Sequence, residues 1–391
     1  MGGETRMAPA ISAGKALAGF FLSGFLYALL GAVLPAWGYH RDPPEFITIG
    51  NCFLSLAVGV IAAHQVAALI LARRTLRFLL VSACCFGCAG LCALALVAPP
   101  AHWGWRLAGL AVIGLAVGLL NNGLFHALAP YAHARTVALG GVWYGLGCLA
   151  VTVLVAGTFY VYTVPSILIL MAVAPALFAG LYAQPALAGR MQAPHPDLKQ
   201  VFRDFHSLGA VLSAALLFFQ FGNEWSIAGW LPLFLVRRLG MSPPASLGLL
   251  SLYWATLLVG RAIAILVLPR VPAGRLLGSS VLLAICGCLM LALTNNAFGA
   301  GMGLVLLGAG FASIYPLLAE RIGNRFPYYH PVFFTGIFSF ALFGGLLAPA
   351  VLGYAAAAGG IRIVMVLPLL GTCMVFALLA LIRLEAKVTG R

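Results

Sequence analysis

Twelve apolar stretches, each long enough to cross a bilayer as a helix, follow one another along this 391-residue chain. A transmembrane helix needs about 20 mostly apolar residues, and it satisfies its backbone hydrogen bonds within the segment. None of the stretches alternates apolar and polar residues as a membrane β-strand does. We therefore predict an all-α membrane protein with twelve transmembrane helices. The predicted spans are residues 14–38, 47–70, 78–98, 105–128, 136–157, 161–183, 208–234, 246–268, 275–293, 298–319, 332–354 and 361–382.

The composition excludes the ordinary soluble classes. Hydrophobic residues make up 63% of the chain and charged residues only 8%, whereas a soluble domain carries about 25% charged residues. No nucleotide-binding loop of the GxxxxGK[ST] type, no HExxH and no GxSxG occurs. Cys84, Cys88 and Cys92 share one face of an apolar span without a neighbouring His, which favours packing over metal or redox chemistry. We predict no enzyme activity, no cofactor and no metal.

The distribution of basic residues predicts the orientation in the membrane. With the N-terminus in the cytoplasm, 17 of the 22 Lys and Arg residues fall on the cytoplasmic side, as the positive-inside rule requires. The net charge of +14 is then a topology signal, so no nucleic-acid partner is predicted. We expect a monomeric, multi-pass protein of the bacterial inner (plasma) membrane with both termini cytoplasmic. No Lys or Arg is expected at mid-membrane, where an anion carrier would need one.

The chain divides into two similar halves. The longest polar segment, residues 184–207, separates six spans from six. After the second span of each half, a glycine begins an apolar stretch that ends in a short basic loop, starting at Gly59 and at Gly260. Repeated halves favour a transporter whose binding site lies between them near mid-membrane. The predicted domains are residues 1–187 and 208–391, joined by a cytoplasmic linker at 188–207.

This organisation resembles the major facilitator superfamily over the whole chain. The basic loop around Arg73, Arg74 and Arg77 matches part of that family's loop motif. The span 7 segment FGNEWSIAGW and the Gly260-Arg261 pair on span 8 are similar to the branch of fucose permeases and sugar facilitators. The resemblance implies two pseudo-symmetric six-helix bundles and transport of a sugar by alternating access.

Glu224 is the acid that the span predictions place near the middle of a helix; the other seven fall in tails, loops or helix ends. A carboxylate at that depth costs about 2.5–3.5 kcal/mol on insertion scales, so such residues are usually functional. We predict that Glu224 carries a proton, binds Na⁺ or a cationic solute, or accepts hydrogen bonds from sugar hydroxyls. A protonated Glu that bonds a neighbouring helix is the structural alternative.

Three polar or aromatic residues near Glu224 are candidate ligands for the solute. Gln220, Asn223 and Trp230 lie on or near one helical face with Glu224, since positions three, four and seven apart stack. Amides can bond sugar hydroxyls, and an indole ring can pack on the C–H face of a sugar. An interfacial aromatic belt is the alternative for Trp230.

A second group of candidates lies on other spans. Asn121 and Asn122 are adjacent on span 4, so we expect one of them to reach a cavity; a hydrogen bond between helices is the alternative. The remaining candidates are weaker, and we favour packing over binding for them. These are Tyr27, Tyr144, Tyr253, Trp254, Ser313 and Tyr315.

A cytoplasmic gate is predicted from the charges near the inner ends of the spans. Arg261 lies in the inner part of span 8, Glu320 ends span 10, and Arg74 lies in the first basic loop. We hypothesise that Arg261 pairs with Glu320 and holds the two halves together on the cytoplasmic side.

The functional prediction is a secondary active transporter of a small polar solute, with a sugar favoured and with proton or sodium coupling through Glu224. One alternative is a proton-driven exporter of drugs or amphipathic metabolites, which a mostly apolar cavity around Glu224 would favour. The other is a non-transporting membrane sensor or assembly factor on the same scaffold. The short loops leave such a factor little docking surface.

Overall fold

The computed structural model of the chain describes residues 13–41, 45–97, 102–128, 134–184, 207–267, 270–325 and 337–388. These residues form helices in all twelve predicted spans, in the predicted order, and no strand. The helices of the first half are α1 Ala13–Tyr27, α2 Leu29–Ala36, α3 Phe46–Arg73, α4 Leu76–Leu96, α5 Trp103–Leu128, α6 Ala134–Ala156, α7 Val164–Met171 and α8 Val173–Tyr182. Those of the second half are α10 Leu208–Leu239, α11 Pro243–Val267, α12 Ala273–Leu293, α13 Ala297–Arg325, α14 Ile337–Gly359 and α15 Ile363–Val388.

Two of the spans are each built from two consecutive helices. A break at Ala28 separates α1 from α2, and a break at Ala172 separates α7 from α8. Within the described residues, eleven spans are long and apolar enough to cross a membrane. The remaining long helix, α10, is less apolar because Gln220, Asn223 and Glu224 interrupt it. Its 32 residues extend about 48 Å, which is more than the thickness of a hydrocarbon core.

Local signals set several of the helix ends. The Thr75 and Ser207 side chains accept hydrogen bonds from backbone N–H groups in the first turns of α4 and α10, where donors would otherwise lack partners. At the other end of α10, Gly240 takes the left-handed conformation with φ +65°. The Gly240 N–H donates to carbonyls of the last turn, which allows a tight connection to α11.

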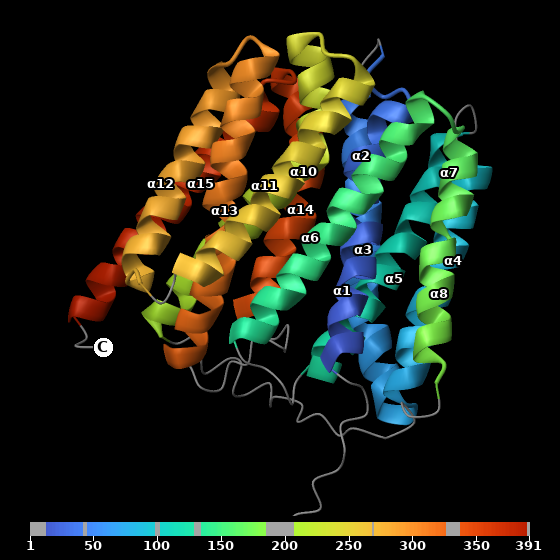
Figure 1. The fold of residues 1–391 in the computed structure, drawn as a ribbon, viewed down its shortest axis with the longest axis horizontal. Coiled ribbons are helices and arrows are strands. Elements are labelled where there is room, and N and C mark those ends of the chain that lie inside the picture. Colours follow the sequence, from blue (N-terminus) through green and yellow to red (C-terminus); the bar gives the residue numbers. More distant parts are fainter. Residues whose placement is uncertain are drawn as a thin grey trace, which may run out of the picture.

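The helices of the two halves lie on opposite sides of the molecule, blue to green on one side and yellow to red on the other (Figure 1). Within each half, glycines allow close helix packing. Gly114 of α5 contacts the backbone of α3, and Gly308 of α13 contacts the backbone of α11. The predicted linker at 188–207 lies outside the described residues except for Ser207, so the division into two domains stays a prediction.

The two halves pack tightly at the end of the molecule where α2 ends and α3 begins, which is the top of Figure 1 and is called the upper end below. A Cβ atom on Gly353 of α14 would lie 2.6 Å from the Cα of Gly50 on α3. A Cβ atom on Gly31 of α2 would lie 2.7 Å from the Ala228 carbonyl oxygen on α10. The bare glycine backbones therefore close the upper end by direct contact between the halves.

A side chain also links the halves at this end. The Arg237 Nη1 near the end of α10 donates a hydrogen bond of 3.2 Å to the His40 carbonyl oxygen, in the turn after α2. Under the predicted orientation, the upper end faces away from the cytoplasm.

We expect Gly353→Ala to weaken the upper contact, because its methyl group cannot fit against Gly50 without moving the backbone. Such overpacking typically costs about 1–3 kcal/mol. Gly248→Ala on α11 is the control, since no atom lies within 4 Å of the added methyl. Thermal unfolding of the purified variants in detergent should show a lower midpoint for Gly353→Ala only. Equal midpoints for the two variants would contradict the close contact.

Candidate functional site: a central cavity with a buried ion pair

A cavity lies between the two halves, below the upper contact. Helices α1, α3, α5 and α6 of the first half and α10, α11, α13 and α14 of the second half line it. The cavity continues towards Leu128 at the end of α5 and Thr136 near the start of α6. This opposite end, at the bottom of Figure 1, is called the lower end below.

Aromatic rings dominate the walls of this central cavity. Seven of its lining residues are aromatic, and four others carry a polar or charged side chain. The aromatic residues are Phe20, Tyr27, Phe125, Tyr144, Phe221, Trp225 and Tyr315. The polar and charged residues are Asn121, Thr136, Glu224 and Arg261.

Glu224 and Arg261 form a buried ion pair in the cavity wall. The Arg261 Nη2 lies 3.6 Å from the Glu224 Oε1, and the two residues are 7% and 6% exposed. The Arg261 Nη1 donates a hydrogen bond to the Gly141 carbonyl oxygen on α6. Arg261 therefore connects α11 with α10 in its own half and with α6 in the other half.

The absence of a side chain at Gly141 makes room for this guanidinium. A Cβ atom on Gly141 would lie 3.2 Å from the Arg261 Nη1, which is tighter than an ordinary contact. Gly145 lies one turn further along α6, on the same side of the helix as Gly141. Both glycines face α11, where they contact Arg261 and Leu258.

One sequence prediction about Arg261 is wrong, and a second, its pairing with Glu320, is not met in this structure. No basic residue was expected at mid-membrane, but Arg261 reaches Glu224. Its long side chain extends there from the lower part of α11. The predicted partner Glu320 is exposed at the lower part of α13. An exposed carboxylate is already solvated, whereas a buried one needs a compensating charge. The guanidinium therefore goes to Glu224.

The third predicted gate residue, Arg74, lies apart from this pair. It is exposed at the end of α3, with its guanidinium carbon 5.7 Å from the centre of the Phe78 ring. The structure does not bring Arg74, Arg261 and Glu320 together as a gate.

The remaining titratable groups around the ion pair are neutral near pH 7. Tyr144 and Cys148 of α6, Tyr253 of α11 and Tyr315 of α13 all interact electrostatically with both charges. Phenols and thiols keep their protons at this pH. Among the described lining residues, Glu224 and Arg261 are thus the two formal charges.

Several of the other predicted site residues do line the central cavity. Tyr27, Tyr144 and Tyr315 do so from three different helices. Asn121 also lines it, and its Oδ1 accepts a hydrogen bond from the Ser23 hydroxyl. Asn122 instead donates its Nδ2 to the Gly118 carbonyl oxygen at 2.7 Å, one turn back on α5.

The predicted neighbours of Glu224 on α10 lie elsewhere. Asn223 donates its Nδ2 to the Thr372 Oγ1 of α15 at 3.3 Å. Trp230 is fully buried near the upper end and donates its Nε1 to the Pro349 carbonyl oxygen at 2.8 Å. Gln220 is 1% exposed and does not line the cavity, and its buried side-chain amide has no hydrogen-bond partner among the described residues. These side chains are buried because α10 packs against both α14 and α15.

Sequence analysis missed Trp225, which lies at the centre of the aromatic wall. Its ring centre is 4.0 Å from that of Tyr27 and 5.7 Å from that of Tyr144, with both pairs nearly perpendicular. The helical spacing of residues along α10 could have identified Trp225. Phe221, Glu224 and Trp225 are three and four positions apart, and this is the face of α10 that the cavity uses.

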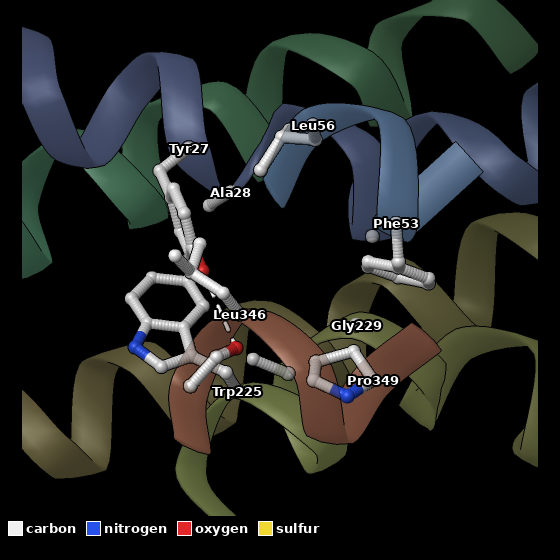
Figure 2. Close-up of a pocket in the computed structure, with 11 residues that line it drawn as sticks. Tyr27, Ala28, Phe53, Leu56, Trp225, Gly229, Leu346 and Pro349 are labelled. Carbon is white, nitrogen blue, oxygen red and sulfur yellow. Dashed lines mark hydrogen bonds between the residues drawn. The ribbon is translucent and has the colours of Figure 1, made fainter. Parts of the chain in front are cut away.

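Above the central cavity lies a smaller pocket, called the upper pocket below. Figure 2 shows Tyr27 and Trp225 on one side of it, and Phe53, Gly229 and Pro349 on the other. Tyr27, Trp225 and Gly345 line both spaces. The Tyr27 hydroxyl donates to the Gly345 carbonyl oxygen at 3.4 Å, the contact dashed in Figure 2. Tyr27 and Trp225 therefore separate the central cavity from the upper pocket.

Comparisons with family models and with curated proteins find no match for the sequence. Solved structures do match. FucP, a fucose:proton symporter of E. coli solved in the outward conformation, has a TM-score of 0.67 at 15% identity, over 96% of this chain and 99% of that one.

A nucleoside transporter, NupG, has a TM-score of 0.69 at 14% identity, over 95% of this chain and 99% of that one. The human organic anion transporter MFSD10 has a TM-score of 0.62 at 15% identity, over 94% and 98%. The chain therefore has the fold of the major facilitator superfamily, as its sequence predicted. At these identities the likeness concerns the fold.

If Tyr27 and Trp225 close the central cavity, Trp225→Ala should open the upper pocket to it. We expect a cysteine at Ala28, which lines only the upper pocket, to react with methyl methanethiosulfonate at least about tenfold faster in that background, since a shielded thiol reacts only while its barrier is open. Gly140→Cys in the central cavity is the control and should react equally in both backgrounds. Mass spectrometry of the labelled peptides separates these thiols from the native cysteines. Unchanged labelling at position 28 would rule out the barrier.

The ion pair should also show strong coupling in stability. Removing one partner of a buried pair typically costs about 3–5 kcal/mol, whereas removing both costs much less. We expect Arg261→Gln to lower the unfolding midpoint at pH 8 and the double variant Glu224→Gln/Arg261→Gln to recover most of the loss. If the double variant is as unstable as the two single changes added together, the two charges do not interact.

Proposed function

We propose that this protein is a secondary transporter that moves a small amphipathic solute across a membrane by alternating access. The observation that supports this most directly is a charged cavity between two halves, which pack closely above it at the glycine contacts of the upper end. A site between repeated halves is the arrangement that rocking transporters use. The fold shared with FucP, NupG and MFSD10 adds support.

The lining of the cavity favours an amphipathic solute over a purely polar one. The seven aromatic residues greatly outnumber the single amide, Asn121. Binding sites for amphipathic ligands combine apolar walls with a few well-placed polar groups. A mostly apolar lining around Glu224 is the one predicted for the alternative, a proton-driven exporter of drugs or amphipathic metabolites.

A sugar is the second candidate solute. Trp225 offers an indole ring beside Glu224, and Asn121 adds an amide in the same cavity. FucP, a fucose:proton symporter with the same fold, is consistent with this candidate.

We assign the coupling role to Glu224 and take the coupling ion to be a proton. Among the described lining residues it is the side chain that can gain and lose charge near neutral pH, since a guanidinium keeps its proton. With the lower end in the cytoplasm, as the basic residues predict, the contact at the upper end is the closed outer gate. The structure then corresponds to an inward-facing state.

The test is uptake into proteoliposomes that hold the purified protein. Hexoses serve as polar probes, and aromatic acids and rhodamine dyes serve as amphipathic probes, with and without an imposed pH gradient. We expect the amphipathic class to be taken up. Glu224→Gln should abolish the response to the gradient, while exchange of preloaded solute at equal pH continues.

Glu320→Gln is the matched control, because it neutralises an exposed carboxylate outside the cavity. It should behave like the wild type. Uptake no greater than into empty liposomes for every probe would contradict transport, and an unchanged pH response in Glu224→Gln would contradict the coupling role.

A further inference from the structure

The two charges in the central cavity differ in what they can do. A carboxylate can be neutralised by a proton, whereas a guanidinium remains charged at any pH a protein meets. Both groups are more than nine-tenths buried, so an uncompensated charge on either would be costly. A solute that separates the pair must therefore supply a negative charge beside Arg261. Glu224 needs no new partner charge, because a proton can neutralise it.

The hydrogen bonding of Arg261 is incomplete. Its Nη1 is used by Gly141, but its Nη2 is 3.6 Å from Glu224, well beyond the 2.7–2.9 Å of a charge-assisted hydrogen bond. Its buried Nε has no hydrogen-bond partner among the described residues. Nε and Nη2 together form the fork that binds a carboxylate through two parallel hydrogen bonds.

The surroundings of this fork suit the rest of an amphipathic acid. Tyr144, Trp225 and Tyr315 line the same cavity as Arg261 and offer apolar ring surface. The groups that face the pair from α6, α11 and α13 are the neutral Tyr144, Cys148, Tyr253 and Tyr315. Among the described residues that line the cavity, no second cation competes for an anion and no second acid repels it.

We propose that Arg261 binds the acidic group of an amphipathic organic anion, which takes the place of Glu224 while Glu224 takes up one proton. The inference rests on the proposed transport function, whose solute it narrows to anions such as aromatic carboxylates. The charges balance, because an anion and a proton enter a site that was neutral and leave it neutral. An amine would instead pair with Glu224 and leave Arg261 without compensation.

The test is binding by the purified full-length protein in detergent, with no transport step. The probes are phenylacetate, its amide and phenethylamine, together with hexanoate, hexanamide and hexylamine. Calorimetry in buffers of different ionisation enthalpy reports proton uptake. We expect each carboxylate to bind about tenfold or more tightly than its amide at pH 6, with about one proton taken up, and to weaken as the pH rises.

Two variants give opposite expectations. Glu224→Gln should free the fork, so the carboxylates bind about tenfold more tightly at pH 8 than they bind wild type, without proton uptake or pH dependence. Arg261→Gln should lose the preference for carboxylate over amide, and Arg261→Lys should recover part of it. Size-exclusion profiles confirm that each variant is folded.

The proposal is overturned if the amines bind best, if Arg261→Gln keeps the carboxylate preference, or if no carboxylate surpasses its amide in either wild type or Glu224→Gln. Failure of transport is distinguishable from these results. Anion binding without flux of any probe would remove the transport proposal alone, and flux of another solute without anion binding would remove this inference alone.

Discussion

An ion pair inside the apolar interior of the protein constrains much of the rest of this structure. Glu224 and Arg261 are both nearly fully buried, and the desolvation of two charges is tolerated only where they compensate each other. The pair lies between the halves, and Arg261 also donates to Gly141 of the opposite half. A change in the charge of Glu224 therefore acts on a contact that holds α11 against α6, so the binding chemistry and the packing of the two halves depend on the same guanidinium.

Aromatic residues determine what else the cavity can accommodate. Tyr27 and Trp225 close its upper side and leave a small apolar pocket between themselves and the glycine contacts of the upper end. The barrier above the ion pair thus has two layers, a ring layer next to the cavity and a backbone layer beyond it. Rotation of two side chains can change the first layer, whereas the second changes only when the halves move.

The sequence predicted the fold well and the site only partly, and the reason is physical. Spans follow from the length and apolarity of each segment, which are local properties. The position of Arg261 depends on a long side chain, on the missing side chain of Gly141 and on a carboxylate 37 positions away in the sequence, so it is a tertiary property. Which face of α10 lines the cavity is also a tertiary property. Polarity pointed to Asn223 and Gln220, but packing against α14 and α15 buries them and turns Phe221 and Trp225 to the cavity.

The location of Arg261 also overturns the sequence-based argument against an anion carrier, which assumed that no Lys or Arg reaches mid-membrane. Counting basic residues by depth places Arg261 with the cytoplasmic charges, because the count uses the position of the backbone. The guanidinium lies several bonds from the backbone, so it can lie at a different depth. It lies beside the buried Glu224, which needs a compensating charge, and not beside the exposed Glu320, which water solvates. A cavity without a cation would not suit an anion carrier. Because Arg261 lines this cavity, anion transport is compatible with this chain. Since only the carboxylate of the pair can lose its charge, the same geometry links the entry of an anion to the entry of a proton.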